Sequence, residues 1–262
     1  MNHLLSKCAV LSSVILLSAC VTSSPTGRNQ VLLFSGGEMA ELGAQSFEEM
    51  KKNEKISTDE KTNAYVQCVT QEITKTLGKQ PDFDQWEVVV FDSPQVNAFA
   101  LPGGKIGVYT GLLQVANNQD QLAAVIGHEI AHVQANHSNE RLSTSQIAGY
   151  GTDISKMAIE GSEYQEIGMG ALGLGVQYGV MMPYGRAQES ESDILGLQLM
   201  NKAGFDPTQS VDLWKNMAKA SGGEEPMEFL STHPSNTTRI KNLQKELTRL
   251  PKSTQPHPTC KL

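Results

Sequence analysis

The chain has 262 residues and a formal net charge of −7, from 21 Lys or Arg and 28 Asp or Glu residues. This length allows one large domain or two small ones, with enough residues to bury a sizeable core. An acidic chain without a basic run argues against nucleic acid as a partner.

The first twenty residues are typical of an export signal. Lys7 and the free amino terminus give a positive start, and the apolar run "CAVLSSVILLSAC" follows over residues 8–20. This run is shorter than the roughly 20 residues of a membrane-spanning helix and suits the roughly 7–15 residues of a signal-peptide core. Its end, "LSAC", resembles the bacterial lipobox, which predicts cleavage before Cys20 and lipid attachment to it. The alternatives are an ordinary cleaved signal and a buried N-terminal strand.

We therefore expect four regions along the chain. They are a lipoprotein signal peptide over 1–19, a flexible lipid-anchored tether over 20–34, a folded domain over 35–250 and a loosely structured Pro-rich tail over 251–262. Val21, rather than Asp, follows the cysteine, and in enterobacteria-like sorting this favours the outer membrane.

Two cysteines remain once the signal is removed and Cys20 carries lipid. Cys68 and Cys260 are an even pair in an exported protein, so they can form a disulfide in an oxidising compartment. Two unpaired thiols are the alternative.

Helix caps and turn residues divide the folded domain into its expected elements. Helices are expected at 35–53, 58–77, 118–136, 186–203, 207–220 and 236–249. The second should begin near Ser57 or Thr58, and Asn118 and Gln121 should begin the third as a capping box. Strands are expected at 86–91 and, around a Pro-Gly-Gly turn, twice within 97–111. Mostly helix with a small sheet gives an α+β fold class.

A Gly-rich apolar stretch, "GMGALGLGVQYGVMM", lies within residues 145–182. It predicts either a close-packed helix or a mobile lid. Five glycines between 168 and 179 interrupt the apolar run, so a membrane-spanning helix is not expected there.

The stretch "IGHEIAH", residues 126–132, places two histidines and a glutamate on one predicted helix. His128 and His132 are four residues apart, so both imidazoles can bind one zinc ion at about 2.0–2.1 Å. Glu129 is rotated about 100° from His128 and can take a proton from a zinc-bound water that attacks a carbonyl. With 6 histidines in the chain, H-E-x-x-H should arise by chance in only about 1% of such chains.

A catalytic zinc ion usually has three protein ligands and one open position. From the residues alone the third ligand stays open, although His137 is out of phase with the face that carries His128 and His132. The candidates are Glu160, Glu163, Glu166, Glu189, Glu191, His137 and His233.

Four segments, in order, resemble the family of HtpX and the CAAX prenyl proteases, which are zinc metallopeptidases. They are "NAFALPGGKIGVYTGLL", "HEIAH", "RAQESESDILGLQLMNKAGFDP" and "STHPSNTTRI". The resemblance covers roughly residues 30–250, and the export signal points to the soluble, periplasmic lipoprotein branch of the family. It implies a mostly helical zincin-like metallopeptidase domain with a small β-sheet beside the HExxH helix, holding one zinc ion per chain.

The resemblance also selects among the candidate ligands. The family carries E-x-x-x-D on its second metal helix, which implies Glu189 as the third zinc ligand and Asp193 as the acceptor of an N–H from a zinc-bound imidazole. Ser192 stands where family members often have Ala. Because Glu189 and Glu191 would point about 200° apart on one helix, we expect Glu191 on the far side, in solvent.

Three further site residues are implied by the same resemblance. His233 and Arg239 match a family His and Arg six residues apart, which would stabilise the oxyanion formed during attack on the carbonyl. Asn97 begins a segment that resembles the substrate-binding edge, where an extended peptide can pair with a strand. On pattern alone, a core role for "NAFAL" is equally consistent.

These features favour an outer-membrane lipoprotein that faces the periplasm and acts as a zinc endopeptidase. The resemblance implies unfolded, misassembled or stalled envelope proteins as substrates, and outer-membrane assembly machinery as a possible partner. The alternative is a chaperone-like or scaffold lipoprotein with a latent or auto-blocked metal site. Glu129 favours the enzyme, since a scaffold does not need it; a metal hydrolase with a non-peptide substrate is a third hypothesis.

Overall fold

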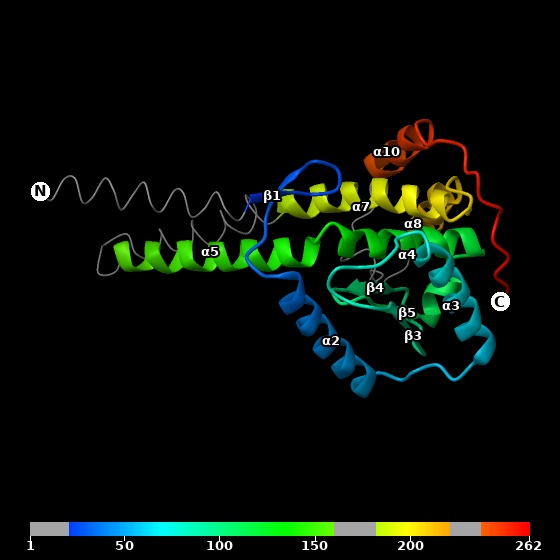
Figure 1. Cartoon of the computed structure of the whole chain (residues 1–262), viewed down its shortest axis with the longest axis horizontal. Helices are drawn as coiled ribbons and strands as arrows, with labels where there is room; N and C mark the ends of the chain where they lie inside the picture. Colours follow the sequence, from blue (N-terminus) through cyan, green and yellow to red (C-terminus); the bar gives the residue numbers. More distant parts are fainter. Residues whose placement is uncertain (1–20, 160–181, 221–236) are drawn as a thin grey trace, which may run out of the picture. The chain divides into compact units, whose positions relative to one another are not determined.

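The computed structural model describes residues 21–159, 182–220 and 237–262 (Figure 1). Its contacts divide the chain into two compact units, which we describe separately. The first comprises Met1–Ser35 and Ala135–Gly185, and the second comprises Gly36–Gln134 and Arg186–Leu262. The predicted fold class, α+β and mostly helical with small sheets, is confirmed in the described residues.

The first unit contains a short hairpin and one long helix. Strand β1 (Val21–Ser23) pairs antiparallel with β2 (Asn29–Val31), and helix α5 covers His137–Ile159. Both terminal nitrogens of Arg28 bind the buried carboxylate of Glu140 on α5, with 2.7 Å between Nη2 and Oε2. The expectation of a flexible tether is therefore wrong from residue 21 on, because this ion pair fixes the segment to α5.

The sequence analysis predicted no element for the first part of α5, residues 137–144. The rest of the helix, to Ile159, lies in the stretch 145–182, for which a close-packed helix and a mobile lid were the two hypotheses. The Gly-rich stretch at 168–179 lies outside the described residues. None of the helices in the described ranges is both long and apolar enough to cross a membrane.

The second unit is built around a three-stranded sheet. Its strands β3 (Glu87–Phe91), β4 (Ala98–Leu101) and β5 (Lys105–Tyr109) lie in the order β3-β5-β4. The hairpin β4–β5 forms as predicted and is antiparallel, whereas β3 runs parallel to β5. Gly103 and Gly104 adopt φ of 81° and 72° in the connecting turn, a backbone region that favours glycine. Because β5 lies between β3 and β4, strand β4 is at the edge of this sheet.

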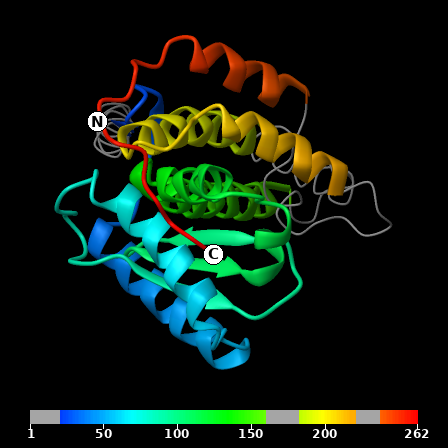
Figure 2. The same ribbon diagram turned by 90° about the vertical axis from the view of Figure 1, so that its right-hand side faces the viewer.

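Helices cover both faces of this sheet (Figure 2). On one face Phe47 of α2 (Gly36–Asn53) packs with Phe91 and Tyr109. On the other face lie α3 (Glu60–Thr74) and α4 (Gln119–Gln134), whose apolar residues form the main core with Ile106 and Val108. Helix α4 is the central helix, because every residue from Asp120 to His132 is buried.

Three more helices lie in the described residues of the second unit. They are the part of α7 (Met182–Lys202) from Arg186 on, α8 (Gln209–Ala220) and α10 (Thr237–Leu247). Helix α8 packs against both α4 and α10. Gly204 ends the α7 segment with φ of 89°, as its position after the predicted helix indicated.

Side-chain caps begin the two helices α3 and α4. Helix α3 starts after Asp59, whose carboxylate accepts the backbone N–H of Thr62 at 2.9 Å, so the predicted start near residue 57 or 58 is slightly early. The cap of α4 follows the prediction, since Asn118 Oδ1 accepts the N–H of Gln121 at 2.9 Å. In a capping box the Gln121 side chain would accept the N–H of Asn118. Here it accepts the backbone N–H of Asn117. The helix ends at Gln134, two residues earlier than expected.

The tail at 251–262 has no regular secondary structure but is held in place, which corrects the expectation of a loosely structured segment. The side chain of Gln119, at the start of α4, donates to the carbonyl of Pro258 and accepts the N–H of Cys260, both at 2.7 Å. Beside it, His257 Nε2 lies 2.9 Å from Asp120 Oδ1. These bonds satisfy polar groups in the first turn of α4.

A disulfide joins Cys68 on α3 to Cys260 in the tail, with 5.7 Å between the two Cα atoms. This is the pair of cysteines that the sequence left for a possible bond. The bridge closes a loop with a sequence separation of 192 residues.

Candidate metal centre

Helices α4 and α7 bring three potential metal ligands together. His128 Nε2 and His132 Nε2 lie 3.1 Å apart, and each lies 3.3 Å from a carboxylate oxygen of Glu189. All three side chains are buried, and theirs is the one group of this kind found among the described residues. The sequence analysis expected these three residues as ligands, Glu189 through the family resemblance, and their binding of a metal stays a prediction.

The donor set fits a zinc ion. Ligand atoms at about 2.0–2.1 Å from a tetrahedral zinc ion lie about 3.3 Å from one another, close to the separations of the two imidazoles and the carboxylate. Two histidines and one glutamate are a known donor set of catalytic zinc sites, which keep a fourth position for water or substrate. The geometry therefore suits a catalytic site better than a closed structural one.

Two glycines allow the helices to approach closely enough for this convergence. A Cβ atom on Gly196 of α7 would lie 2.9 Å from the backbone nitrogen of His128. A Cβ atom on Gly127 of α4 would lie 3.1 Å from the carbonyl oxygen of Gly196. Any larger residue at Gly196 would therefore meet the backbone next to a ligand.

Asp193 contacts the second ring nitrogen of His128. Its Oδ1 lies 3.2 Å from His128 Nδ1, whereas Nε2 is the nitrogen that lies near Glu189. Arg239 Nη2 lies 3.2 Å from Nδ1 and 3.1 Å from Nε2. Burial and the charge of Arg239 lower the pKa of His128, but hydrogen bonds to Asp193 and Glu189 outweigh them and raise it to about 9. An acidic partner for the second imidazole nitrogen is the usual way to orient a metal-binding histidine.

Arg239 on α10 binds the two carboxylates of the site. Its Nε and Nη2 donate to Asp193 at 2.6 and 2.8 Å, and its Nη1 lies 3.0 Å from Glu189 Oε2. The guanidinium is buried, with 6% of its side chain exposed. Burial raises the pKa of Asp193, but Arg239 and His128 outweigh this effect and hold the pKa below its usual range. The structure thus places Arg239 inside the site; its role at the oxyanion stays a prediction.

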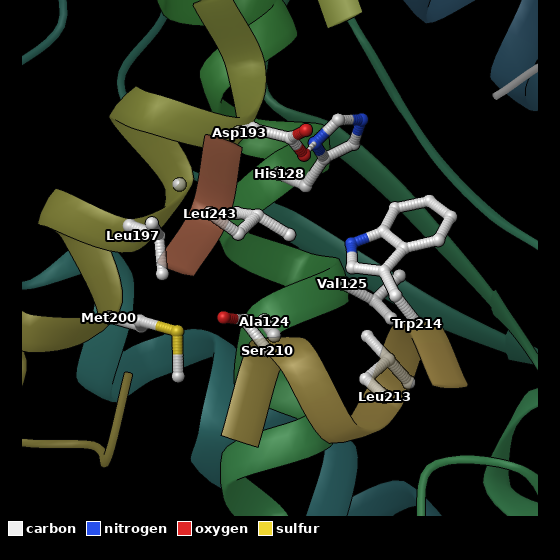
Figure 3. A pocket seen from close by; sticks show the side chains of 11 residues that line it. Ala124, Val125, His128, Asp193, Leu197, Met200, Ser210, Leu213, Trp214 and Leu243 are labelled. Atoms are coloured by element: carbon white, nitrogen blue, oxygen red, sulfur yellow. Dashed lines mark ion pairs between the residues drawn. The ribbon is translucent and has the colours of Figure 1, made fainter. Parts of the chain in front are cut away.

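Trp214 on α8 is a site residue that the sequence analysis did not name. Its ring centroid lies 3.7 Å from the Arg239 guanidinium carbon and 6.3 Å from the centroid of the His128 ring, with an angle of 77° between the two ring planes. With His128 and Asp193 it lines a small cavity of about 10 Å³ (Figure 3). One feature of the sequence could have drawn attention to Trp214: the chain has only 2 tryptophans, and this one lies on an amphipathic helix.

Two further glutamates on α4 and α7 are buried. Glu129 directly follows the proposed ligand His128 on α4, and it is buried, with 3% of it exposed. Glu191 is 4% exposed, and the expectation that it faces solvent is wrong. Helix phase separates it from Glu189, but α7 is covered on more than one side, because Gln188, Ser192 and Gly196 are buried as well.

The remaining candidates have different positions. Asn97 precedes the edge strand β4, where its Oδ1 accepts the N–H of Ala98 and its carbonyl accepts the N–H of Tyr109. Its side chain is half-buried, and its substrate role stays a prediction. His233 and Cys20 lie outside the described residues.

The fold and the site define a zincin-like metallohydrolase, with an HExxH helix packed on a small sheet and a glutamate from a second helix. The chain belongs to peptidase family M48, whose model matches residues 60–247. Membership of a metallopeptidase family confirms the class predicted from the sequence; the narrower resemblance to HtpX and the CAAX prenyl proteases stays a prediction.

Named relatives agree with this assignment. The chain is 35% identical to the mitochondrial metalloendopeptidase OMA1 of Schizosaccharomyces pombe over 71% of this chain and 53% of the relative. It is 29% identical to OMA1 of Bos taurus over 98% of this chain and 51% of the relative. It is 30% identical to the beta-barrel assembly-enhancing protease of Escherichia coli over 58% of this chain and 32% of the relative. The chain thus spans about half the length of the OMA1 relatives.

Proposed function

We propose that this protein is a zinc-dependent endopeptidase of the bacterial cell envelope. The observation that carries the proposal is the convergence of His128, His132 and Glu189 on one point, with Glu129 next to the first ligand. A ligand set needs no glutamate at that position, whereas hydrolysis needs a base there.

Each described residue of the site then has a distinct task. A zinc ion held by His128, His132 and Glu189 would supply Lewis acidity that lowers the pKa of water in the site. Glu129 accepts the proton of the attacking water and delivers it to the leaving amine. Asp193 keeps His128 oriented by accepting the Nδ1–H. Arg239 contributes a positive charge, where negative charge develops on the peptide oxygen.

We propose that substrates bind as extended segments along β4. This strand lies at the sheet edge, packs beside α4 and follows Asn97, so its outer backbone groups suit pairing with an added strand. Recognition through backbone groups suits unfolded or stalled chains, which expose their backbone. We therefore include misassembled envelope proteins as substrates and outer-membrane assembly machinery as a partner, a proposal supported by the name of the Escherichia coli relative.

The proposed location is the outer membrane, facing the periplasm, with a lipid on Cys20. Support comes from the "LSAC" ending and from the disulfide between Cys68 and Cys260, which suits an oxidising compartment. Radiolabelled palmitate and membrane fractionation test this part. Cys20→Ser should abolish labelling and release the protein from membranes, whereas unchanged labelling would exclude Cys20 as the lipid site.

The decisive experiment compares wild type with Glu129→Gln on casein and on an unfolded outer-membrane protein. Zinc is quantified in both proteins. The wild type should cleave both substrates, and the variant should retain zinc without cleaving. Cleavage by the zinc-loaded variant at the wild-type rate contradicts the mechanism, and a zinc-loaded wild type that binds substrates without cutting them supports the scaffold alternative.

A further inference from the structure

Arg239 is held by two kinds of contact, ion pairs at its edges and an aromatic ring against its face. Along its edge, Nε and Nη2 donate to the two oxygens of Asp193 at 2.6 and 2.8 Å. Against its face lies the indole of Trp214, with the guanidinium carbon 3.7 Å from the ring centroid. On the other side of the guanidinium, Nη1 lies 3.0 Å from Glu189 Oε2. These contacts lie around the edges of the cation, whereas the flat ring of Trp214 covers its face and opposes tilting out of that plane.

The position of Trp214 suits this restriction. Trp214 lies on α8 and Asp193 lies on α7, whereas Arg239 lies on α10. The guanidinium of Arg239 is therefore contacted from two other helices. Trp214 is 4% exposed and Arg239 is 6% exposed. A cation–π contact is stronger when water is excluded, because the cation is less solvated.

We infer that Trp214 is a positioning residue that fixes the plane of the Arg239 guanidinium toward Glu189 and the metal centre. The inference rests on the proposed function for its effect on turnover, but the contact between the ring and the cation does not depend on it. Trp214 is not one of the three proposed metal ligands. Its substitution should therefore lower kcat through Arg239 while leaving the metal ligands in place.

The test uses Trp214→Phe and Trp214→Leu in the full chain, with Trp86→Phe as the matched control at the other tryptophan. Trp86 packs edge-on against Phe83 and is not among the residues of the site. Trp214→Leu should keep its zinc and its KM but lower kcat about 30-fold, the size of a buried cation–π contact. The kcat of Trp214→Phe should lie between those of Trp214→Leu and wild type, because phenylalanine keeps a weaker aromatic face. Equal losses in Phe and Leu would indicate packing alone and overturn the inference.

Arg239→Ala provides the second arm. If Trp214 acts through Arg239, then Trp214→Leu should cause no further loss of kcat in the Arg239→Ala background. An equal loss in both backgrounds overturns the inference.

A spectroscopic arm separates this inference from the peptidase proposal and covers a Leu variant that does not fold. In the Trp86→Phe background Trp214 is the one remaining tryptophan. With excitation selective for tryptophan, Arg239→Ala should therefore change the intensity or position of its fluorescence whether or not the protein cleaves anything. Emission that does not respond to the loss of Arg239 contradicts the contact. A zinc-loaded wild type without peptidase activity, but with a responsive emission, contradicts only the proposed function.

Discussion

Gly127 of α4 and Gly196 of α7 face each other between the two helices that carry the proposed metal ligands. A Cβ atom on Gly196 would meet the backbone nitrogen of His128 at 2.9 Å and its Cα at 3.0 Å. The obstacle is backbone, which cannot rotate away as a side chain can. The spacing of the ligand set therefore depends on two residues that carry no side chain.

Gly196→Ala should weaken zinc binding without removing a ligand. The new methyl group must push α7 from α4, at a cost of about 1–3 kcal/mol for overpacking, and Glu189 moves with α7. Zinc content after dialysis against a weak chelator and the thermal midpoint would show both effects. Gly37→Ala is the control, since a Cβ there has nothing within 4 Å. Full zinc retention in Gly196→Ala would mean that the helices tolerate the methyl group.

Glu189→Gln should lose most of its zinc, whereas Glu191→Gln should keep it. Both glutamates are buried on α7, but only Glu189 approaches the two histidines. The pair is matched in helix, burial and chemical change, so plasma mass spectrometry of the two purified variants isolates the ligand role. Metal loss in the Glu191 variant alone would show that the helix phase has been assigned wrongly.

Zinc affinity should rise with pH up to about 9. The proton on His128 occupies the lone pair that a metal needs, and the raised pKa of about 9 keeps that proton in place through neutral pH. The apparent affinity should rise about tenfold per pH unit below this value and level off above it. Competition with a fluorescent chelator at several pH values measures this. A plateau already at about pH 7 would mean that His128 has an ordinary pKa.

Cys68→Ser with Cys260→Ser should destabilise the oxidised protein. The chain-entropy model assigns about 5 kcal/mol to so long a loop, and measured losses are typically about 2–4 kcal/mol. The tail should also become accessible to proteolysis, because Cys260 and its neighbours bind the first turn of α4. Urea unfolding of both proteins, with and without reductant, checks this. Equal midpoints for wild type and variant without reductant would remove the disulfide as a source of stability.

Local patterns predicted the parts of this structure that depend on neighbours in sequence. His128 and His132 share a helix face because they are four residues apart, and Asn118 caps its helix through a residue three positions later. The hairpin β4–β5 follows from its turn glycines. The choice of Glu189 needed more than helix phase, since only the resemblance to a family selected it from seven candidates.

Contacts between distant segments explain what the sequence did not predict. Trp214 contacts Arg239 from another helix, and no spacing rule connects the two. The tail looked loose because it is Pro-rich, yet Gln119 and Cys68 fix it from elsewhere in the chain. In the first unit, Arg28 orders a segment of polar and small residues through Glu140. Burial of Glu191 likewise reflects tertiary packing around α7.

The disulfide between Cys68 and Cys260 also keeps the chain covalently connected when one peptide bond between these two residues is cut. Helices α4 and α7, with all three proposed ligands, lie between these cysteines in sequence. A single cut anywhere in that interval, by the protein itself or by another protease, leaves two fragments joined through sulfur. A nicked molecule cut between α4 and α7 would therefore keep both halves of its ligand set tethered, and would run as one species on a gel until a reductant was added.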